Sequence, residues 1–335
     1  MKRYKNILVT GASGFIGSNF IKVVFDNNEF SKSVENIINL DKLTYAGNIE
    51  NNKEYSANPK YNFIKGDIAS EEIVYKILTQ YQIDLVVNFA AESHVDNSIN
   101  DPSEFIKTNI FGVYNLLSCS KKYEDLGNQI TLLHVSTDEV YGSLKIDEDN
   151  FDEATSYKPN SPYSASKAAS DHLVRAWNKT YGLKTFITNC SNNYGPMQHN
   201  EKLIPKVISN AVKGINIPIY GQGDNIRDWL YVDDHCKAIL SVLESGEYGE
   251  TYNIGGLNEK TNIEIVTAIC EILDELLPKS EPYKKLIHFI ADRPGHDFRY
   301  SINAEKIMNK LDWHPEESFE TGIRKTIHWY LKDIL

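Results

Sequence analysis

The stretch Val9–Gly17 reads VTGASGFIG, and it stands between an apolar run and a helical pattern. Its three glycines, Gly11, Gly14 and Gly17, suit a tight turn, the approach of a pyrophosphate to the backbone, and close packing of a helix on a strand. The backbone amides at the start of the helix can bind an anion. Because the spacing is G-x-x-G-x-x-G, a plain structural turn is the alternative, and the surrounding elements have to decide.

Around this turn, apolar runs with strand character alternate with helical periodicity. The expected strands of the first half are Asn6–Thr10, Ile37–Leu40, Tyr61–Lys65, Leu85–Phe89, Thr131–Val135 and Lys184–Thr188, and the expected helices include Phe15–Asp26, Pro102–Lys121 and Pro162–Thr180. This alternation predicts an α/β fold of the Rossmann type, a doubly wound parallel sheet with helices on both faces. The early strands are almost continuously apolar, as expected when both faces are covered.

After Ser191 the pattern changes to short strands mixed with helices. The expected strands are Ile217–Tyr220, Leu230–Val232, Tyr252–Ile254 and Ile287–Ile290, and the expected helices are Leu203–Lys213, Asp233–Glu244, Asn262–Leu276 and Glu320–Leu331. We therefore expect a Rossmann domain over 1–190 that carries the catalytic residues, and a smaller mixed α/β substrate lobe over 191–335, with the chain crossing between them. Asn27–Glu35 and Asp147–Thr155 are expected to be polar surface loops.

The composition limits the classes of protein to which the chain can belong. Of 335 residues, 41% are hydrophobic and 11% aromatic, which is typical of a globular core. A formal net charge of −11 disfavours a nucleic-acid partner, because phosphate backbones bind basic surfaces. Cys119, Cys190, Cys236 and Cys270 form no C-x-x-C pair, which indicates reduced thiols rather than disulfides or a metal site. The first apolar run is too short for a signal peptide or a membrane span, so we expect a cytoplasmic protein without a metal.

The second and third expected strands each end near a carboxylate. Asp41 can accept hydrogen bonds from an adenosine ribose and repel a 2′-phosphate, which favours NAD over NADP. Lys42 follows directly and could soften that preference. Asp67, after the third strand, could bind the adenine edge, and a strand-terminal turn or a helix cap is an equally good interpretation of its position.

Tyr163 and Lys167 lie four residues apart in SPYSASK. Ser161 suits the N-cap and Pro162 the first helical position, so both side chains should share one helix face. A phenol with an ordinary pKa of about 10 is a poor base at neutral pH. We expect the Lys167 ammonium, with a positive nicotinamide ring nearby, to lower the pKa of Tyr163. Tyr-x-x-x-Lys alone is common on surface helices, but combined with the glycine turn it is a strong signal.

Thr137, Asp138 and Glu139 follow the strand expected at Thr131–Val135. Ligands of a doubly wound sheet bind beyond the carboxyl ends of its strands, which places this triplet at the cleft. Two adjacent carboxylates repel each other, so one tends to keep its proton, and the pair then provides one acid and one base. The alternative is a solvated turn with two surface carboxylates.

Taken together, these motifs resemble the extended short-chain dehydrogenase/reductase family, and closely its nucleotide-sugar 4,6-dehydratase branch, over nearly the whole chain. The resemblance rests on the glycine turn, Leu40–Asn48 (LDKLTYAGN), Ala90–Asp96 (AAESHVD), Ser136–Gly142 (STDEVYG), Ser161–Lys167, Asn192–Pro196 (NNYGP), Glu201–Pro205 (EKLIP) and Asp292–Asp297 (DRPGHD). The Thr-Asp-Glu triplet discriminates most, because the similar nucleotide-sugar 4-epimerases usually carry small hydroxyl residues at 138 and 139.

The resemblance implies an internal redox cycle on dTDP-glucose that gives a 4-keto-6-deoxy sugar and leaves NAD unchanged. Tyr163 would deprotonate the C4 hydroxyl while hydride moves to NAD, with Thr137 sharing the hydrogen bond. Glu139 would remove the C5 proton, Asp138 would protonate the departing C6 hydroxyl, and the hydride would return to C6. The resemblance also implies deoxysugar biosynthesis, which could serve a surface polysaccharide, rhamnose supply or a specialised metabolite, and a homodimer through the helices at 102–121 and 162–180.

Binding roles follow from the same resemblance. The cofactor would be bound by Gly11, Gly14, Phe15, Ile16, Gly17, Asp41, Lys42, Thr44, Gly47, Asp67, Ile68, Ala90, Ala91, Ser93, Thr108, Tyr163, Lys167 and Asn193. The nucleotide sugar would be bound by Ser93, Thr137, Asn192, Lys202, Leu203, Lys206, Pro218, Tyr220, Arg227, Asn262, Arg293 and His296. Lys206, Arg227 and Arg293 are the expected diphosphate partners, since a guanidinium binds phosphate oxygens in bidentate fashion. Ordinary surface charge is the alternative for Lys206.

Other functions explain the motifs less well. A 4-epimerase eliminates no water, so Asp138 and Glu139 would have no task. A decarboxylase on the same scaffold would need a cationic pocket for a sugar carboxylate, which the sequence does not indicate. A regulatory protein that only senses NAD would have no use for the complete set of catalytic side chains.

Overall fold

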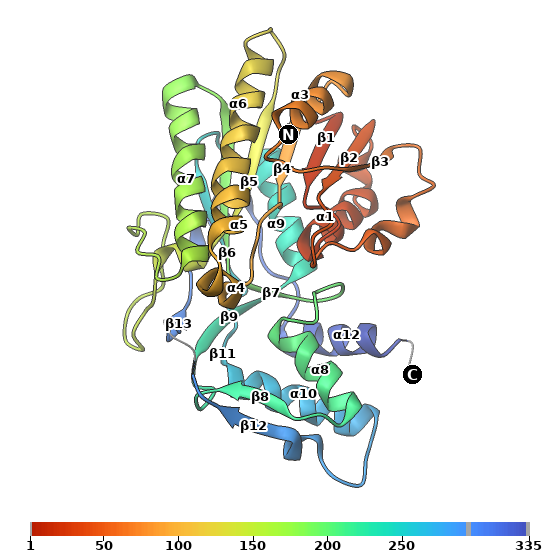
Figure 1. Cartoon of the computed structure of the whole chain (residues 1–335), viewed down its shortest axis with the longest axis vertical. Coiled ribbons are helices and arrows are strands. Elements are labelled where there is room, and N and C mark those ends of the chain that lie inside the picture. Colours follow the sequence, from red (N-terminus) through yellow and green to blue (C-terminus); the bar gives the residue numbers. More distant parts are fainter. Residues whose placement is uncertain (1, 293–295, 333–335) are drawn as a thin grey trace.

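The computed structural model describes residues 2–292 and 296–332, and a seven-stranded sheet forms the larger part of the molecule (Figure 1). Its strands are β1 (Asn6–Thr10), β2 (Asn36–Asp41), β3 (Tyr61–Lys65), β4 (Leu85–Asn88), β5 (Thr131–Thr137), β6 (Lys184–Cys190) and β10 (Thr251–Ile254). They are all parallel, in the order β10-β6-β5-β4-β1-β2-β3. The winding direction changes between β1 and β4, which is the position where open α/β sheets bind ligands.

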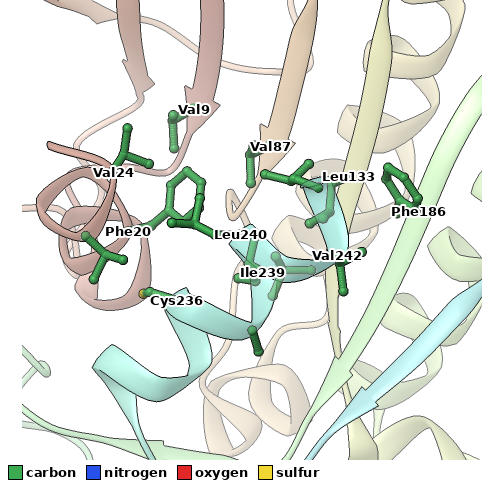
Figure 2. Packing of buried hydrophobic residues seen from close by; sticks show 14 of the residues in the cluster. Val9, Phe20, Val24, Val87, Leu133, Phe186, Cys236, Ile239, Leu240 and Val242 are labelled. Carbon is green, nitrogen blue, oxygen red and sulfur yellow. The ribbon is translucent and has the colours of Figure 1, made fainter. Parts of the chain in front are cut away.

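Helices cover both faces of this sheet. One face is covered by α1 (Phe15–Asp26) and α9 (Val232–Ser245), and the other by α3 (Glu71–Gln80), α6 (Val113–Glu124) and α7 (Pro162–Tyr181). Figure 2 shows the first of these cores, which includes Val9, Val87, Phe20 and Leu240. The neighbouring strand residue Leu8 belongs to the core on the opposite face. Burial on both faces explains why the strands are almost continuously apolar.

The predicted parallel sheet is confirmed, and most strand positions agree with the prediction. β1 and β3 match the predicted ranges at both ends. β5 continues two residues beyond the predicted end, so that Ser136 and Thr137 are still part of the strand and are buried. β6 likewise continues to Cys190. Hydroxyl side chains carry no apolar signal, and for this reason the sequence pattern ended β5 too early.

The helix predicted at 102–121 is wrong in one respect, because it is not a single α-helix. α5 (Ser103–Phe105) leads into a π-helical segment, η2 (Ile106–Gly112), and only then into α6. Within η2, Asn109 accepts a hydrogen bond from the Glu92 nitrogen at 2.9 Å and donates to the Glu92 oxygen at 3.0 Å. The wide helical turn therefore holds the chain segment that follows β4, and π-helical turns are frequent at functional sites.

The smaller part of the molecule has a hydrophobic core of its own. Its strands are β7 (Asn192–Tyr194), β8 (Ile217–Tyr220), β9 (Ile226–Tyr231), β11 (Glu259–Thr261), β12 (Ile287–Ile290) and β13 (Arg299–Tyr300), and its helices include α8 (Leu203–Lys213), α10 (Asn262–Leu276) and α12 (Phe319–Leu331). β9 pairs with β7, β11 and β13, whereas β8 pairs with β12. The strand predicted at 230–232 begins earlier, at Ile226, and Val232 already starts α9.

After residue 191 the chain returns to the large part. α9 packs on α1, and β10 forms the sheet edge beside β6. α11 (Glu305–Leu311) packs on α9 and β10. We therefore propose a boundary near residue 190, with 232–254 and 305–311 counted with the Rossmann part.

The two predicted surface loops contain some order. Asn28–Ser31 forms a short helix, α2, that is capped by the Asn27 side chain. In the second loop, Phe151 is buried and forms a bridge with Ile302. The remaining short elements are α4 (Val95–Asn100), η1 (Ile49–Tyr55), η3 (Asp138–Tyr141) and η4 (Tyr283–Leu286). In the described ranges, we find no helix with the length and apolar character that crossing a bilayer requires.

Candidate active site

One cavity lies at the carboxyl ends of β1, β2, β4 and β5 and reaches α7 and the segment before α8. Every residue predicted to bind the cofactor lines it. All five predicted catalytic residues line it as well, and so do Ser93, Asn192 and Lys202 of the predicted sugar-nucleotide set. The fold therefore brings the cofactor and catalytic predictions together in one place.

The glycine turn combines two kinds of glycine. Gly11 has a φ of +67°, and a Cβ on it would lie 2.6 Å from the Ala90 nitrogen. A Cβ on Gly17 would lie 2.7 Å from the Cα of Ala12. Gly14 is less crowded, with its closest contact at 3.2 Å, and it starts α1 without a side-chain cap. Packing therefore requires Gly11 and Gly17, while Gly14 leaves the first amides of α1 accessible to a pyrophosphate.

Asp41 is held rigidly at the end of β2. Its two carboxylate oxygens accept hydrogen bonds from the backbone nitrogens of Leu43 at 2.7 Å and Ser13 at 2.9 Å. The side chain is buried and lines the cavity. A fixed acceptor in this position suits the hydroxyls of an adenosine ribose and repels a 2′-phosphate.

Lys42 does not cancel the charge of Asp41, because other carboxylates compensate its ammonium. Lys42 Nζ lies 3.1 Å from Asp67 Oδ2 and 3.5 Å from Glu104 Oε2. Asp67 also accepts a hydrogen bond from the Ala69 nitrogen at 2.9 Å, so it stabilises a turn in addition to lining the cavity. The strand-terminal turn is therefore one role of Asp67, and its contact with the adenine edge stays a prediction.

The helix that carries Tyr163 and Lys167 begins as predicted. Ser161 caps α7 by accepting a hydrogen bond from the Ser164 nitrogen at 3.0 Å, and Pro162 follows as the first helical residue. Both Tyr163 and Lys167 are buried and line the cavity, one helical turn apart. Lys167 Nζ donates to the Val135 carbonyl oxygen at 2.8 Å, which ties α7 to β5.

The pKa of Tyr163 differs from the expectation. Burial and then the Glu139 charge raise the pKa of the phenol well above its ordinary value, and the hydrogen bond from Thr137 acts in the opposite direction. Burial lowers the pKa of Lys167 to about 8. The groups of the chain alone therefore do not lower the pKa of Tyr163, and the expected joint effect of Lys167 and a nicotinamide ring stays a prediction. A cation beside the phenol, such as the oxidised nicotinamide ring, has to stabilise the phenolate.

Asp138 and Glu139 have unequal surroundings. Asp138 is 1% exposed, and burial followed by the charges of Glu139 and Asp228 raises its pKa well above the usual range. Its Oδ1 accepts a hydrogen bond from Thr137 at 3.2 Å, while Oδ2 has no hydrogen-bond partner among the described residues. Glu139 is only partly buried and lines the same cavity. The surroundings of Asp138 therefore favour its protonated form, which marks it as the acid of the pair.

Most of the remaining residues predicted to hold the nucleotide sugar lie in the smaller part, outside the lining of this cavity. These are Leu203 and Lys206 on α8, Pro218 and Tyr220 on β8, Arg227 on β9, Asn262 on α10, and His296. Arg293 lies outside the described residues. Tyr220 reaches the larger part, since its hydroxyl lies 3.4 Å from Asp96 Oδ2. The substrate roles of these residues stay predictions.

Arg227 is buried and held mainly by the backbone. Its guanidinium donates to the carbonyl oxygens of Ile226, Asp297 and Phe298 at 2.7 to 3.2 Å. It also lies over the ring of Tyr300, 4.2 Å from the centroid. Its charge lowers the pKa of Asp138, so the guanidinium acts electrostatically on the catalytic cavity.

Comparison with known proteins agrees with this geometry. The family model of GDP-mannose 4,6-dehydratase matches residues 8–326. The chain belongs to this family. A curated relative, dTDP-glucose 4,6-dehydratase 1 of Escherichia coli, is 53% identical over 98% of this chain and 93% of its own length.

Two solved structures of dTDP-glucose 4,6-dehydratases resemble this member of the GDP-mannose 4,6-dehydratase family. The enzyme from Bacillus anthracis in complex with NAD is 47% identical, with a TM-score of 0.87 and coverage of 98% of this chain and 97% of that one. The enzyme from Streptomyces venezuelae, also with NAD bound, is 43% identical, with a TM-score of 0.91 and the same coverages.

In this family member, the sequence motifs gave no role to several residues that line the cavity. Glu92 lies four residues after the end of β4, and burial raises its pKa. Its position beyond the end of a central strand was the signal that could have identified it. Glu201 Oε2 lies 3.8 Å from both His94 Nε2 and His199 Nδ1. Glu201 begins the EKLIP motif, but its place beside His94 and His199 arises only when the folded chain brings the segment before α8 back to the cavity.

Proposed function

We propose that this chain is an NAD-dependent lyase that converts dTDP-glucose into dTDP-4-keto-6-deoxyglucose. The observation that carries the proposal is the pair of carboxyls beside Tyr163, of which Asp138 is buried with a raised pKa and Glu139 lines the same cavity. Elimination of water needs one acid and one base, and a 4-epimerase has no such step. Relatives named dTDP-glucose 4,6-dehydratase, about half identical over nearly the full chain, support the substrate.

The cavity has the features that NAD requires. The first amides of α1, which follow Gly14, suit the pyrophosphate, and the fixed Asp41 carboxylate suits the adenosine ribose. When bound, NAD accepts a hydride from sugar carbon C4 and later returns it to C6. Tyr163 and Lys167 line the same cavity, where this exchange would take place.

The side chains of this protein supply the proton transfers. Tyr163, with the nearby Lys167 ammonium, takes the proton of the C4 hydroxyl as the ketone forms. The ketone acidifies the hydrogen on C5, and Glu139 removes it as a proton. Asp138 gives its own proton to the C6 hydroxyl, which leaves as water. A proton then returns to C5 when the hydride reaches C6, so the sum of the steps is loss of one water molecule.

A homodimer is part of this proposal. Ile106, Phe111, Tyr114 and Tyr181 are large apolar side chains between 41% and 53% exposed, and they lie on η2, α6 and α7. The Tyr114 and Trp177 rings, 5.9 Å apart, join α6 to α7 in this exposed face. Clustered exposed aromatic and aliphatic residues are typical of a protein–protein interface.

We place the protein in the cytoplasm, in deoxysugar biosynthesis such as rhamnose supply. All four cysteines are buried and form no disulfide, which suits a reducing compartment. A 4-keto-6-deoxy sugar nucleotide is an intermediate rather than an end product, because its ketone remains to be reduced or modified.

A turnover assay tests the proposed function. Purified protein with NAD is incubated with dTDP-, UDP- or CDP-glucose, and product is detected by the near-ultraviolet absorbance of 4-keto sugars in alkali. We expect product from dTDP-glucose in preference to the other two. Recovery of a galactose epimer, or of unchanged substrate, would contradict the proposal. The double variant Asp138→Asn with Glu139→Gln is the control, and it should still bind NAD.

A further inference from the structure

A row of buried polar side chains connects β1 to Lys167. Thr10 Oγ1 donates to Asn88 Oδ1 at 2.5 Å, and Asn88 Nδ2 lies 2.9 Å from His134 Nδ1. His134 Nε2 lies 3.3 Å from Lys167 Nζ and 3.5 Å from Asp171 Oδ1. All five residues are between 0% and 3% exposed. The mechanism above uses only Lys167 of these groups, so the others lack an assigned task.

The hydrogen bonds assign the tautomer of His134. The Ala90 nitrogen donates to Thr10 Oγ1 at 3.4 Å, so the Thr10 hydroxyl hydrogen is available for Asn88 Oδ1. Asn88 then presents its amide nitrogen, which is only a donor, to His134 Nδ1. Burial lowers the pKa of His134 well below its ordinary value, so the ring is neutral. A neutral ring that accepts at Nδ1 carries its hydrogen on Nε2.

His134 Nε2–H and the Lys167 ammonium are therefore two donors that face each other. Such a pair needs a negative charge nearby, and Asp171 Oδ1 lies 3.5 Å from His134 Nε2. The other oxygen of Asp171 accepts from Ser136 Oγ at 2.9 Å and from the Tyr157 hydroxyl at 3.1 Å. These two donors hold the carboxylate in place, one helical turn after Lys167 on α7.

Asp171 also provides a charge that Lys167 needs. A buried ammonium is costly unless an opposite charge lies close to it. The Asp171 charge acts to raise the pKa of Lys167 against the effect of burial. The pKa of Asp171 is itself about 6, raised by burial, so the carboxyl is ionised at neutral pH. Neither Asp171 nor His134 lines the cavity, so both act through Lys167.

We propose that Asp171 and His134 are positioning residues that keep the Lys167 ammonium charged and directed at its place beside Tyr163. The proposal rests on the proposed function, in which that ammonium supports the phenolate. Asp171 provides the buried counter-charge, and the His134 ring lies between the two, with Nε2 3.3 Å from Lys167 Nζ and 3.5 Å from Asp171 Oδ1.

The charges around Lys167 determine the expected pH dependence. The titratable groups that face Lys167 are Asp171 on α7, His134 on β5 and Cys190 on β6. Burial has the largest effect and lowers the pKa of Lys167 to about 8. Asp171 raises this pKa, so its removal lowers it. Activity requires the ammonium and falls as the pH rises through this pKa. Loss of Asp171 should therefore move the alkaline limb of kcat to lower pH.

The variant Asp171→Asn tests this directly, since it removes the charge but keeps an acceptor for Ser136 and Tyr157. We expect the alkaline limb of kcat to move down by about one pH unit, with KM for dTDP-glucose little changed. Asp234→Asn is the matched control. Asp234 is equally buried, on α9, and accepts from the backbone nitrogens of Glu316 and Glu317. Its replacement should leave the limb where it is.

Two further variants and a direct readout keep the test decisive, even where Asp171→Asn does not fold. His134→Gln retains an N–H donor and should keep the limb near wild type, whereas His134→Leu should move it. The pH dependence of Lys167 acetylation by acetic anhydride, followed by peptide mass spectrometry, reports the same pKa without turnover. An unmoved Lys167 pKa in Asp171→Asn or His134→Leu overturns the inference. Absence of 4-keto product from wild type would instead overturn the proposed function.

Discussion

Asp138 and Glu139 are neighbours in sequence but differ in what surrounds them. Asp138 is enclosed, and Glu139 and Asp228 both oppose its ionisation. Glu139 is the more exposed of the two and faces the same cavity as the Tyr163 phenol. Both side chains are carboxylic acids, but their different surroundings suit one as the acid and the other as the base.

Replacement of Glu139 by Gln should separate oxidation from elimination. The amide cannot accept the C5 proton, so C4 oxidation can proceed and NADH can accumulate, but C5 should not exchange with deuterated solvent. NADH absorbance and mass spectrometry of recovered sugar measure the two steps. Asp138→Asn is the comparison, because it should retain exchange and lose dehydration. Unimpaired exchange in Glu139→Gln would remove Glu139 from the role of base.

The glycines of the turn between β1 and α1 should respond differently to substitution. Gly17→Ala places a Cβ 2.7 Å from the backbone of Ala12 and should cost about 1–3 kcal/mol of unfolding free energy. Gly14→Ala is less crowded and should be nearly as stable as wild type, but its methyl group should weaken NAD binding. Urea unfolding and NAD titration measure the two effects. Equal stability of both variants would contradict this difference.

Local signals explain which elements the sequence could predict. The limits of α1 and α10 follow from their apolar spacing, and α10 is also marked by a capping box at Thr261 and Glu264. The π-helical segment η2 could not be predicted, because it depends on Asn109 bonding Glu92 and Ser166, which are distant in sequence. Strands as short as β7 and β13 are set by pairing with β9 rather than by any pattern of their own.

The same distinction applies to the site. The glycine turn, the Tyr163 helix and the Thr-Asp-Glu triplet carry their chemistry in contiguous motifs, and the fold assembles them in one cavity. No contiguous motif marks Asp171 or His134. Their roles depend on contacts that form only when α7 packs on β5. The pKa of Tyr163 also escaped prediction, since it depends on burial, which a motif does not report.

At the scale of the whole molecule, the exposed apolar face of η2, α6 and α7 should join two copies of the chain. Phe111 is 53% exposed there, so Phe111→Glu should place a charge in the interface and give a monomer in light scattering. Ile146→Glu is the control, since Ile146 is 72% exposed and lies outside η2, α6 and α7. A wild-type monomer, or a Phe111→Glu variant that remains dimeric, would contradict the proposed interface.

The proposed reaction moves one hydrogen from C4 to C6 of the sugar within a single cavity. Following that hydrogen is the most direct test of the account. dTDP-glucose labelled with deuterium at C4 is converted in ordinary water, and the product is analysed by proton NMR and mass spectrometry. Because the same bound nicotinamide accepts and returns the hydride, we expect deuterium at C6 of a 4-keto-6-deoxy sugar. Deuterium found again at C4, in glucose or its epimer, would contradict the account.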